Sequence, residues 1–269
     1  MKKLLLLCSV LSLSVLWPGD AIAQLKIGGK KLNTAKLLDA GKDVAKAVTL
    51  SDSDIAQLSR EAVAWMDANN PVADETTEYG ARLKRLTEGI TEVDGLPLNF
   101  KVYKVADVNA FACGDGSIRV FSALMDLMDD DELMAIIGHE IGHVVHADTK
   151  HAMKNAYLAS AARNAAGAAE GSRLAKLSGS QLGELVPAFT DAQFSQKQEY
   201  EADEYGFEFS VKHGFSPYAM GNSLNKLVEL SKGAKASTVQ KMFSSHPDSE
   251  KRAARMKEKA DAHATAQQQ

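Results

Sequence analysis

Cysteine is scarce in this chain of 269 residues, which contains only Cys8 and Cys113. A fold held together by several disulfides is therefore excluded. Cys8 lies in an N-terminal segment that we expect to be removed, and Cys113 alone cannot form an internal bond. Cys113 fits the role of a small buried apolar residue, although a redox role or metal inhibition stays open.

The chain also lacks an excess of positive charge, long apolar runs after its N-terminus, internal repeats and phosphate-binding glycine loops. With 31 Lys and Arg against 35 Asp and Glu, the net charge is −4, which argues against a nucleic-acid-binding protein. No later segment is apolar enough to span a bilayer. A composition of 45% hydrophobic and 25% charged residues is typical of an ordinary globular protein, for which one domain is expected.

The N-terminus has the pattern of a secretory signal peptide. Lys2 and Lys3 precede an apolar run over residues 4–17, and Ala21-Ile22-Ala23 is a small-x-small cleavage site. A retained membrane anchor is the alternative, but the apolar run is short for a transmembrane helix. The sequence thus predicts export and cleavage after Ala23.

Hydrophobic periodicity predicts helices, then a small sheet, then further helices. Ser51 begins a helix, and a second one ends near Gly95. Alternation over 98–102 predicts a strand, and two more short strands flank the turn at 114–116. This order indicates an α+β fold that is mainly helical, with a small three-stranded sheet beside the helix that carries residues 139–143. The expected organisation is a signal peptide (1–23), an N-terminal lead-in (24–50), one domain (51–263) and a polar tail (264–269).

The stretch His139-Glu140-Ile141-Gly142-His143 carries the most information about chemistry. Two histidines four residues apart on a helix face the same way and can bind one metal ion from consecutive turns. Neutral imidazole is a good ligand for zinc, and Glu140 can take a proton from a water molecule as a general base. Because the pattern is short, an ordinary core helix with two satisfied histidines is the alternative.

Helix signals surround this motif. Asp129 and Glu132 form a capping-box pattern, and apolar residues follow at helical spacing. Two nearby histidines, His146 and His151, are not ligands by spacing alone. We interpret them as residues of the polar face or as partners that orient other groups.

A catalytic zinc site needs a third protein ligand from elsewhere in the chain. Glu199 is the best candidate, because Glu199 and Asp203 are four residues apart and share a helix face. One carboxylate can bind the metal while the other contacts the second ring nitrogen of a ligating histidine. A solvated acidic helix is the alternative for this cluster taken alone.

These motifs, with Phe194-Ser195 before Glu199 and with His246-Pro247 and Arg252 after Asp203, resemble those of the HtpX and CAAX-prenyl-protease-like zinc metallopeptidases. Within that family the chain is most similar to the periplasmic proteases of the BepA, LoiP and YcaL type. The resemblance covers about residues 50 to 255 and includes a segment, 107–122, that in the family forms the strand above the active site. It implies a zincin-like core of the gluzincin class.

The resemblance also implies roles for individual residues. It makes His139, His143 and Glu199 the ligands of one Zn²⁺ per chain, Glu140 the catalytic base and Asp203 a residue that orients a ligand.

His246 matches a histidine that in relatives approaches the zinc from a loop, where it either blocks the open position or stabilises the oxyanion. From the residues alone it is equally a helix-start histidine before Pro247. Arg252 either anchors this loop or is a solvated helix arginine.

The resemblance also favours a place for the substrate. Asn109, Ala110, Phe111 and Ala112 are the candidate edge strand to which a substrate adds as an extended strand. An ordinary interior strand is the alternative. The Ala-, Gly- and Ser-rich segment 152–185 is either a lid over the cleft or a helix pair packed through small side chains.

The sequence therefore predicts a zinc-dependent endopeptidase of the bacterial cell envelope, in the periplasm and peripheral to the outer membrane. By resemblance, its partners are unfolded or misfolded envelope proteins and the outer-membrane assembly machinery. Cys8 lies inside the apolar run, so no lipid anchor is expected, and no helical repeat domain of the BepA type follows the peptidase core. Two alternatives are a chaperone-like protein that holds clients in the same cleft and a zinc hydrolase acting on cell-wall material.

Overall fold

The computed structural model describes residues 26–27, 30–31, 51–165, 178–232, 240, 242 and 244–268. The expected signal peptide lies outside these residues, as do most of the lead-in and the middle of the 152–185 segment. Within the lead-in, strands β1 (Lys26–Ile27) and β2 (Lys30–Lys31) pair antiparallel.

Two helices precede the main sheet. α2 (Asp52–Asn69) begins after Ser51, as predicted, and the Ser51 hydroxyl and the Asp54 carboxylate form a capping box that satisfies the free backbone N–H groups of its first turn. α3 (Glu78–Leu86) follows and ends well before Gly95, where the sequence predicted its end. The residues near Gly95 instead form the short antiparallel pair β3 (Glu92–Val93) and β4 (Leu96–Pro97), and Gly95 lies in the turn between them with a φ of 75°.

The central sheet has the three strands that the sequence predicts. They are β5 (Asn99–Tyr103), β6 (Ala110–Ala112) and β7 (Ser117–Phe121), in the order β5-β7-β6. β7 runs parallel to β5 and antiparallel to β6. Gly116 makes the turn before β7 with a φ of 87°, and a side chain there would collide with the carbonyl oxygen of Pro97.

Helices make up most of the remaining structure, which confirms the α+β class. They are α4 (Ser122–Leu127), α5 (Asp130–Val145), α6 (Asp148–Ala165), α7 (Gly179–Leu185), α8 (Pro187–Thr190), α9 (Gln196–Lys212), α10 (Ala219–Lys232) and α12 (Ser249–Ala266). α12 continues to Ala266, inside the stretch 264–269 that the sequence assigns to a polar tail. Among the described helices, none combines the length and the apolar character needed to cross a membrane.

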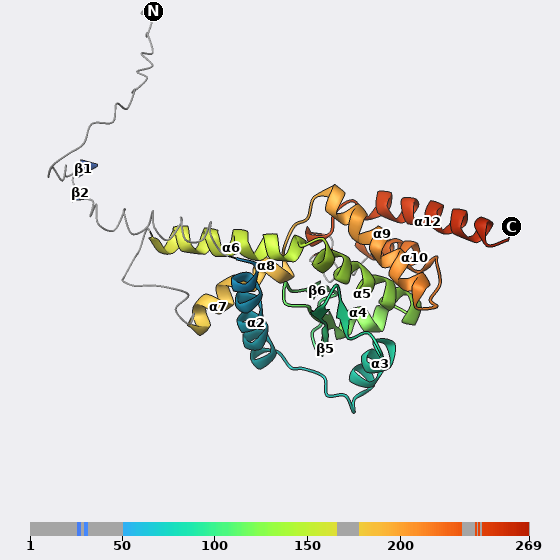
Figure 1. The fold of residues 1–269 in the computed structure, drawn as a ribbon, viewed down its shortest axis with the longest axis horizontal. Helices are drawn as coiled ribbons and strands as arrows, with labels where there is room; N and C mark the ends of the chain where they lie inside the picture. Colours follow the sequence, from blue (N-terminus) through green and yellow to red (C-terminus); the bar gives the residue numbers. More distant parts are fainter. Residues whose placement is uncertain are drawn as a thin grey trace, which may run out of the picture.

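The sheet separates two groups of helices (Figure 1). One core cluster packs α2 against Phe111 and Phe121 on one face of the sheet. A larger cluster joins the other face to α5, and a third joins α5 to α10 and α12. α5 is consequently surrounded, and every residue from Glu132 to Val144 is buried. The helix that carries the HExxH motif is therefore the centre of the fold.

Candidate metal centre

A capping box fixes the start of helix α5, and with it the position of both histidines of the motif. The Asp129 carboxylate accepts a hydrogen bond from the Glu132 backbone and the Glu132 carboxylate accepts one from the Asp129 backbone, as the capping-box pattern predicts. His139 and His143 follow two and three turns later and are almost completely buried. Their two Nε2 atoms lie 3.1 Å apart.

Helix α9 approaches α5 closely enough to add Glu199 because glycines line the contact. A Cβ on Gly206 of α9 would lie 2.8 Å from the carbonyl oxygen of Ala135 and 2.9 Å from the backbone nitrogen of His139. A Cβ on Gly142 of α5 would lie 3.0 Å from the Cα of Ala202. At Gly206 a side chain would force backbone atoms apart, and at Gly142 it would push the neighbouring helix outward, so these two glycines allow the close approach.

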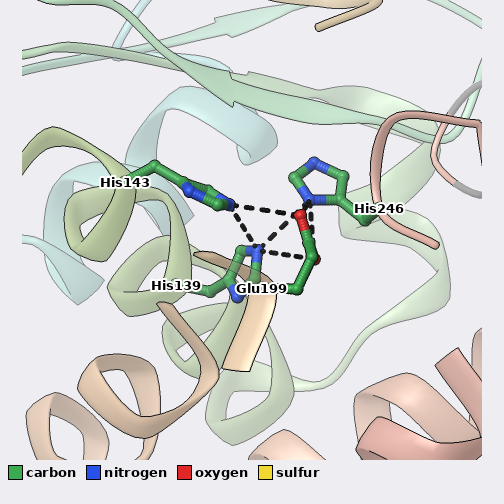
Figure 2. Close-up of side chains that lie close together, drawn as sticks. All are labelled: His139, His143, Glu199 and His246. Atoms are coloured by element: carbon green, nitrogen blue, oxygen red, sulfur yellow. Dashed lines mark hydrogen bonds and ion pairs between the residues drawn. The ribbon is translucent and has the colours of Figure 1, made fainter. Parts of the chain in front are cut away.

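Four polar side chains converge at this point (Figure 2). His139, His143, Glu199 and His246 each offer one ligand atom, and these atoms lie within 4.8 Å of one another. His139 Nε2 is 3.2 Å from His246 Nδ1, which is 3.1 Å from Glu199 Oε1. His143 Nε2 is 3.5 Å from the same Glu199 oxygen. The structure thus brings together the three predicted ligands and His246.

The arrangement fits a zinc ion. Ligand atoms about 2.0–2.1 Å from a tetrahedral metal are separated from each other by about 3.3 Å. The contacts of His139, of Glu199 and between the two helical histidines run from 3.1 to 3.7 Å, inside the 4.8 Å that bounds the whole cluster. The Nε2 lone pairs of His139 and His143 also face one another. That contact is unfavourable unless a proton or a metal cation lies between the two nitrogens.

Two carboxylates hold the outer nitrogens of these histidines. Asp203 Oδ1 lies 3.0 Å from His139 Nδ1, as the spacing of Asp203 from Glu199 predicts. On the other ring, His143 Nδ1 donates to Asp148 Oδ2 at 2.9 Å. Because a carboxylate only accepts, the Nδ1 proton of His143 faces Asp148 and the Nε2 atom of His143 is left free for a metal. His139 Nδ1 lies within ion-pair distance of Asp203 but makes no hydrogen bond.

The two histidines have opposite pKa shifts. Burial lowers the pKa of His139 to about 4, although Asp203 opposes this change. Burial also lowers the pKa of His143, but hydrogen bonds to Asp148 and Glu199 outweigh it and raise that pKa to about 9. At pH 7 and without metal, His143 is therefore protonated on both ring nitrogens, and metal binding must displace the proton on Nε2.

Arg252 is a buried counter-charge for the two acidic residues of α9. Its Nε and Nη2 donate to the two oxygens of Asp203 at 2.8 and 2.6 Å, and Nη1 contacts Glu199 Oε2. The side chain is 1% exposed, which excludes the solvated arginine that the sequence left open. Burial alone would raise the pKa of Asp203, but the guanidinium outweighs it and lowers that pKa to about 2.

Glu140 lies beside the cluster with one free oxygen. It is 2% exposed, and its Oε1 has no hydrogen-bond partner. His246 Nε2 is 3.7 Å from that atom. Burial raises the pKa of Glu140, which makes its carboxylate a stronger base than one in water.

The candidate substrate strand, β6, lies at an edge of the three-stranded sheet, paired with β7. Its edge is covered, because Ala110, Phe111 and Ala112 are only 1–3% exposed. α8 contributes to this cover: Asn109 Nδ2 donates to the Thr190 carbonyl oxygen at 3.3 Å. The structure therefore places the strand beside Glu140 in a closed arrangement.

The remaining candidates lie away from the cluster. His146 and His151 are exposed, in agreement with polar-face positions. Cys113 is a fully buried free thiol, as expected of a small core residue, and burial raises its pKa.

Sequence reasoning missed several residues that support the site. Asp148 was not identified, because the chain reverses between His143 and Asp148 and no helical spacing relates them. Phe194 belongs to the motif that carries the resemblance, but its role was not predicted: its ring stacks on His143 with centroids 3.9 Å apart. Gln198 donates to Asp148, and its signal was present in the Ser195-x-x-Gln198 capping pattern at the start of α9.

Comparison with known proteins agrees with this geometry. The sequence profile of peptidase family M48 matches residues 79–260, which include all the residues of the cluster. The chain belongs to peptidase family M48. It is a metalloprotease, and its cofactor is zinc.

Relatives in this family match along most of the chain. The metalloprotease LoiP of Escherichia coli (strain K12) is 38% identical over 243 residues, which cover 90% of this chain and 94% of LoiP. YcaL of the same strain is 37% identical and covers 85% of this chain and 88% of YcaL. The β-barrel assembly-enhancing protease of that strain is 30% identical, and the match covers 61% of this chain but 35% of that protein.

Proposed function

We propose that this M48 metalloprotease is an endopeptidase of the bacterial cell envelope that hydrolyses unfolded or misassembled proteins. We further propose that it works in the periplasm, peripheral to the outer membrane. Its partners would be unfolded envelope proteins and the outer-membrane assembly machinery. His139, His143 and Glu199 are the proposed protein ligands of one zinc ion.

The unpaired carboxylate oxygen of Glu140 beside three converging ligands is the observation that carries this proposal. A buried acceptor without a partner is energetically unfavourable, and a water molecule placed for attack would satisfy it. Zinc, when bound, supplies a Lewis acid that polarises the scissile carbonyl and makes water more acidic. Glu140 takes the proton from the attacking water and delivers it to the leaving amine.

The register of β6 supports an extended substrate. The backbone bonds from Phe121 to Asn109 and from Cys113 to Ser117 direct the odd-numbered residues of β6 toward β7. The backbone groups of Ala110 and Ala112 therefore point to the open side of the sheet, where Ala112 already hydrogen-bonds Glu140. A substrate would pair there as an added strand once the covering segment moves, and an unfolded chain can do this with little side-chain selectivity.

The envelope location rests on two supports. One is the signal-peptide pattern of residues 1–23. The other is the name of one relative, the β-barrel assembly-enhancing protease, which links that protein to the assembly of β-barrel proteins. Fractionation of cells that express the chain checks the location, and recovery in the cytoplasm would contradict it.

Zinc content and cleavage of casein by wild type, Glu140→Gln and His246→Ala test the proposed activity. We expect one zinc per chain in wild type and Glu140→Gln, cleavage by wild type, and none by Glu140→Gln. Faster cleavage by His246→Ala would show that His246 blocks the open metal position, whereas slower cleavage would show that it stabilises the oxyanion. Wild type that binds unfolded casein with zinc present and never cuts it would favour the chaperone-like alternative.

A further inference from the structure

Asp148 reaches His143 through an abrupt reversal of the chain. α5 ends at Val145, Ala147 has a φ of 60°, and α6 begins at Asp148. A left-handed alanine costs about 1 kcal/mol. Despite this cost, the turn places the buried Asp148 carboxylate 2.9 Å from His143 Nδ1.

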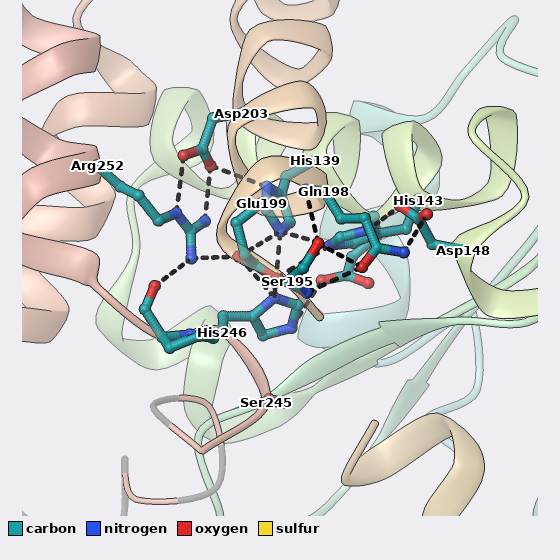
Figure 3. Close-up of polar contacts among 12 residues, drawn as sticks. His139, His143, Asp148, Ser195, Gln198, Glu199, Asp203, Ser245, His246 and Arg252 are labelled. Carbon is teal, nitrogen blue, oxygen red and sulfur yellow. Dashed lines mark hydrogen bonds and ion pairs between the residues drawn. The ribbon is translucent and has the colours of Figure 1, made fainter. Parts of the chain in front are cut away.

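Both ends of the Gln198 side chain have specific partners (Figure 3). Its Oε1 accepts hydrogen bonds from the backbone and the hydroxyl of Ser195 at 2.9 and 2.8 Å. Its Nε2 donates to Asp148 Oδ1 at 2.6 Å. Because two donors face the oxygen and an acceptor-only carboxylate faces the nitrogen, the orientation of this amide is determined.

These contacts form a closed circuit around the cluster. His143 contacts Asp148, Asp148 contacts Gln198, and Gln198 precedes Glu199. Glu199 Oε1 returns to His143 Nε2 at 3.5 Å. The circuit joins α5, α6 and α9, so a shift of the start of α9 would change both Glu199 and the partner of His143.

We propose that Gln198 is a positioning residue for zinc: it holds Asp148 against His143 and couples that pair to the helix turn that carries Glu199. This inference rests on the ligand set proposed above. Gln198 acts through Asp148 and does not contact the metal. Residues that support a metal ligand in this way typically change metal affinity 10- to 100-fold when replaced.

Gln198→Glu separates this role from helix capping. Glutamate has the same shape, is favoured at this capping-box position, and suits a helix N-terminus. It keeps an oxygen that accepts the hydrogen bonds of Ser195, but it removes the N–H group that donates to Asp148. We expect the zinc dissociation constant, measured by chelator competition, to rise 10- to 100-fold, and the visible spectrum of the cobalt-substituted protein to shift.

Ser195→Ala is the matched control, because it removes the cap and leaves the amide of Gln198 able to reach Asp148. We expect this variant to lower the melting temperature of the metal-free protein while its zinc affinity stays within threefold of wild type. The proposal is overturned if Gln198→Glu binds zinc within threefold of wild type, or if Ser195→Ala weakens zinc as much as Gln198→Glu does.

A double-mutant cycle tests whether Gln198 acts through Asp148. Asp148→Asn combined with Gln198→Glu should bind zinc no more weakly than Asp148→Asn alone, and an additive loss would refute the coupling. His143→Ala separates the two proposals. If it keeps wild-type zinc affinity, the ligand set is wrong and this inference fails with it; if it loses zinc while Gln198→Glu binds normally, only the role of Gln198 is wrong.

Discussion

Arg252 is the cation that makes two neighbouring buried carboxylates tolerable. It contacts Glu199 and Asp203 and lies almost wholly out of solvent. The planar guanidinium reaches both acidic residues at once, which a lysine ammonium cannot do with the same geometry.

Replacement of Arg252 by leucine should lower the free energy of unfolding by about 3–5 kcal/mol, because it leaves buried charge without a partner. Arg255→Leu is the control on the same helix. Arg255 forms a partly exposed pair with Glu204, so its loss should cost less than about 1 kcal/mol. Urea denaturation measures both values, and equal losses would contradict the assignment.

A second ionic group, partly buried, lies on the other side of the sheet. Asp67 of α2 accepts hydrogen bonds from Arg119, Lys101 and Tyr103. Burial alone would raise the pKa of Asp67, but these donors outweigh it and lower that pKa. The group ties α2 to the sheet without contacting the metal cluster.

The Asp67 group predicts part of the acid sensitivity of the protein. Its folded pKa lies below the unfolded value of about 3.9, so its stabilisation is complete above about pH 4 and is lost as the pH falls toward the folded pKa. Asp67→Asn should be less stable than wild type at pH 6, and its stability should fall less between about pH 4 and pH 2.5. Denaturation at each pH measures both stabilities, and an equal fall in the two proteins over that range would exclude the effect.

The residues that sequence reasoning could identify are those with a regular local spacing. His139, Glu140 and His143 follow from one helical motif, and Glu199 with Asp203 from another. Asp148 escaped because its position depends on the left-handed turn at Ala147. The burial of Arg252 escaped as well, because a charged residue on a polar helix carries no signal that its partners are also buried.

Glycines line the contact between α5 and α9. Gly138 and Gly142 of α5 face Gly206 and Ala202 of α9. The ligands come from these two helices, so the spacing of the helices sets the spacing of the ligands.

Gly206→Ala should therefore weaken zinc binding without touching a ligand. The new methyl group would lie 2.8 Å from the Ala135 carbonyl oxygen, so α9 must move and carry Glu199 with it. We expect lower zinc affinity and a stability loss of about 1–3 kcal/mol. Gly183→Ala in α7 is the control: its methyl would meet only Trp65 at 3.4 Å, so zinc affinity should not change. Unchanged affinity in Gly206→Ala would show that the helices can adjust.

The three strands were predictable, whereas the arrangement of the sheet was not. β6 and β7 flank a glycine-containing turn, which is a local signal. The parallel pairing of β5 with β7 connects residues that are separated along the chain, and alternation gives no information on which strand becomes the central one. The cover over β6 could not be predicted from local sequence either, because it involves α8, which is distant along the chain.

Zinc should contribute to the stability of the entire protein, because its ligands come from elements far apart in the chain. A ligand that binds only the folded state stabilises it by about 4 kcal/mol at a thousand times its dissociation constant. Chelation should therefore lower the calorimetric melting temperature of wild type and of Glu140→Gln. His143→Ala should show a much smaller change on chelation. If the chelator leaves the melting temperature of wild type unchanged, a zinc site in the core is contradicted.

The central position of α5 has a consequence for how the metal leaves. A helix buried on all sides cannot unfold locally at a low free-energy cost. The amides of residues 133–144 should therefore exchange with deuterium only when the molecule unfolds globally. We expect a chelator to reach the ion through the substrate side of the cluster, without opening of α5. The rate of zinc loss would report how often the cover over β6 opens, and not how often the metal helix frays.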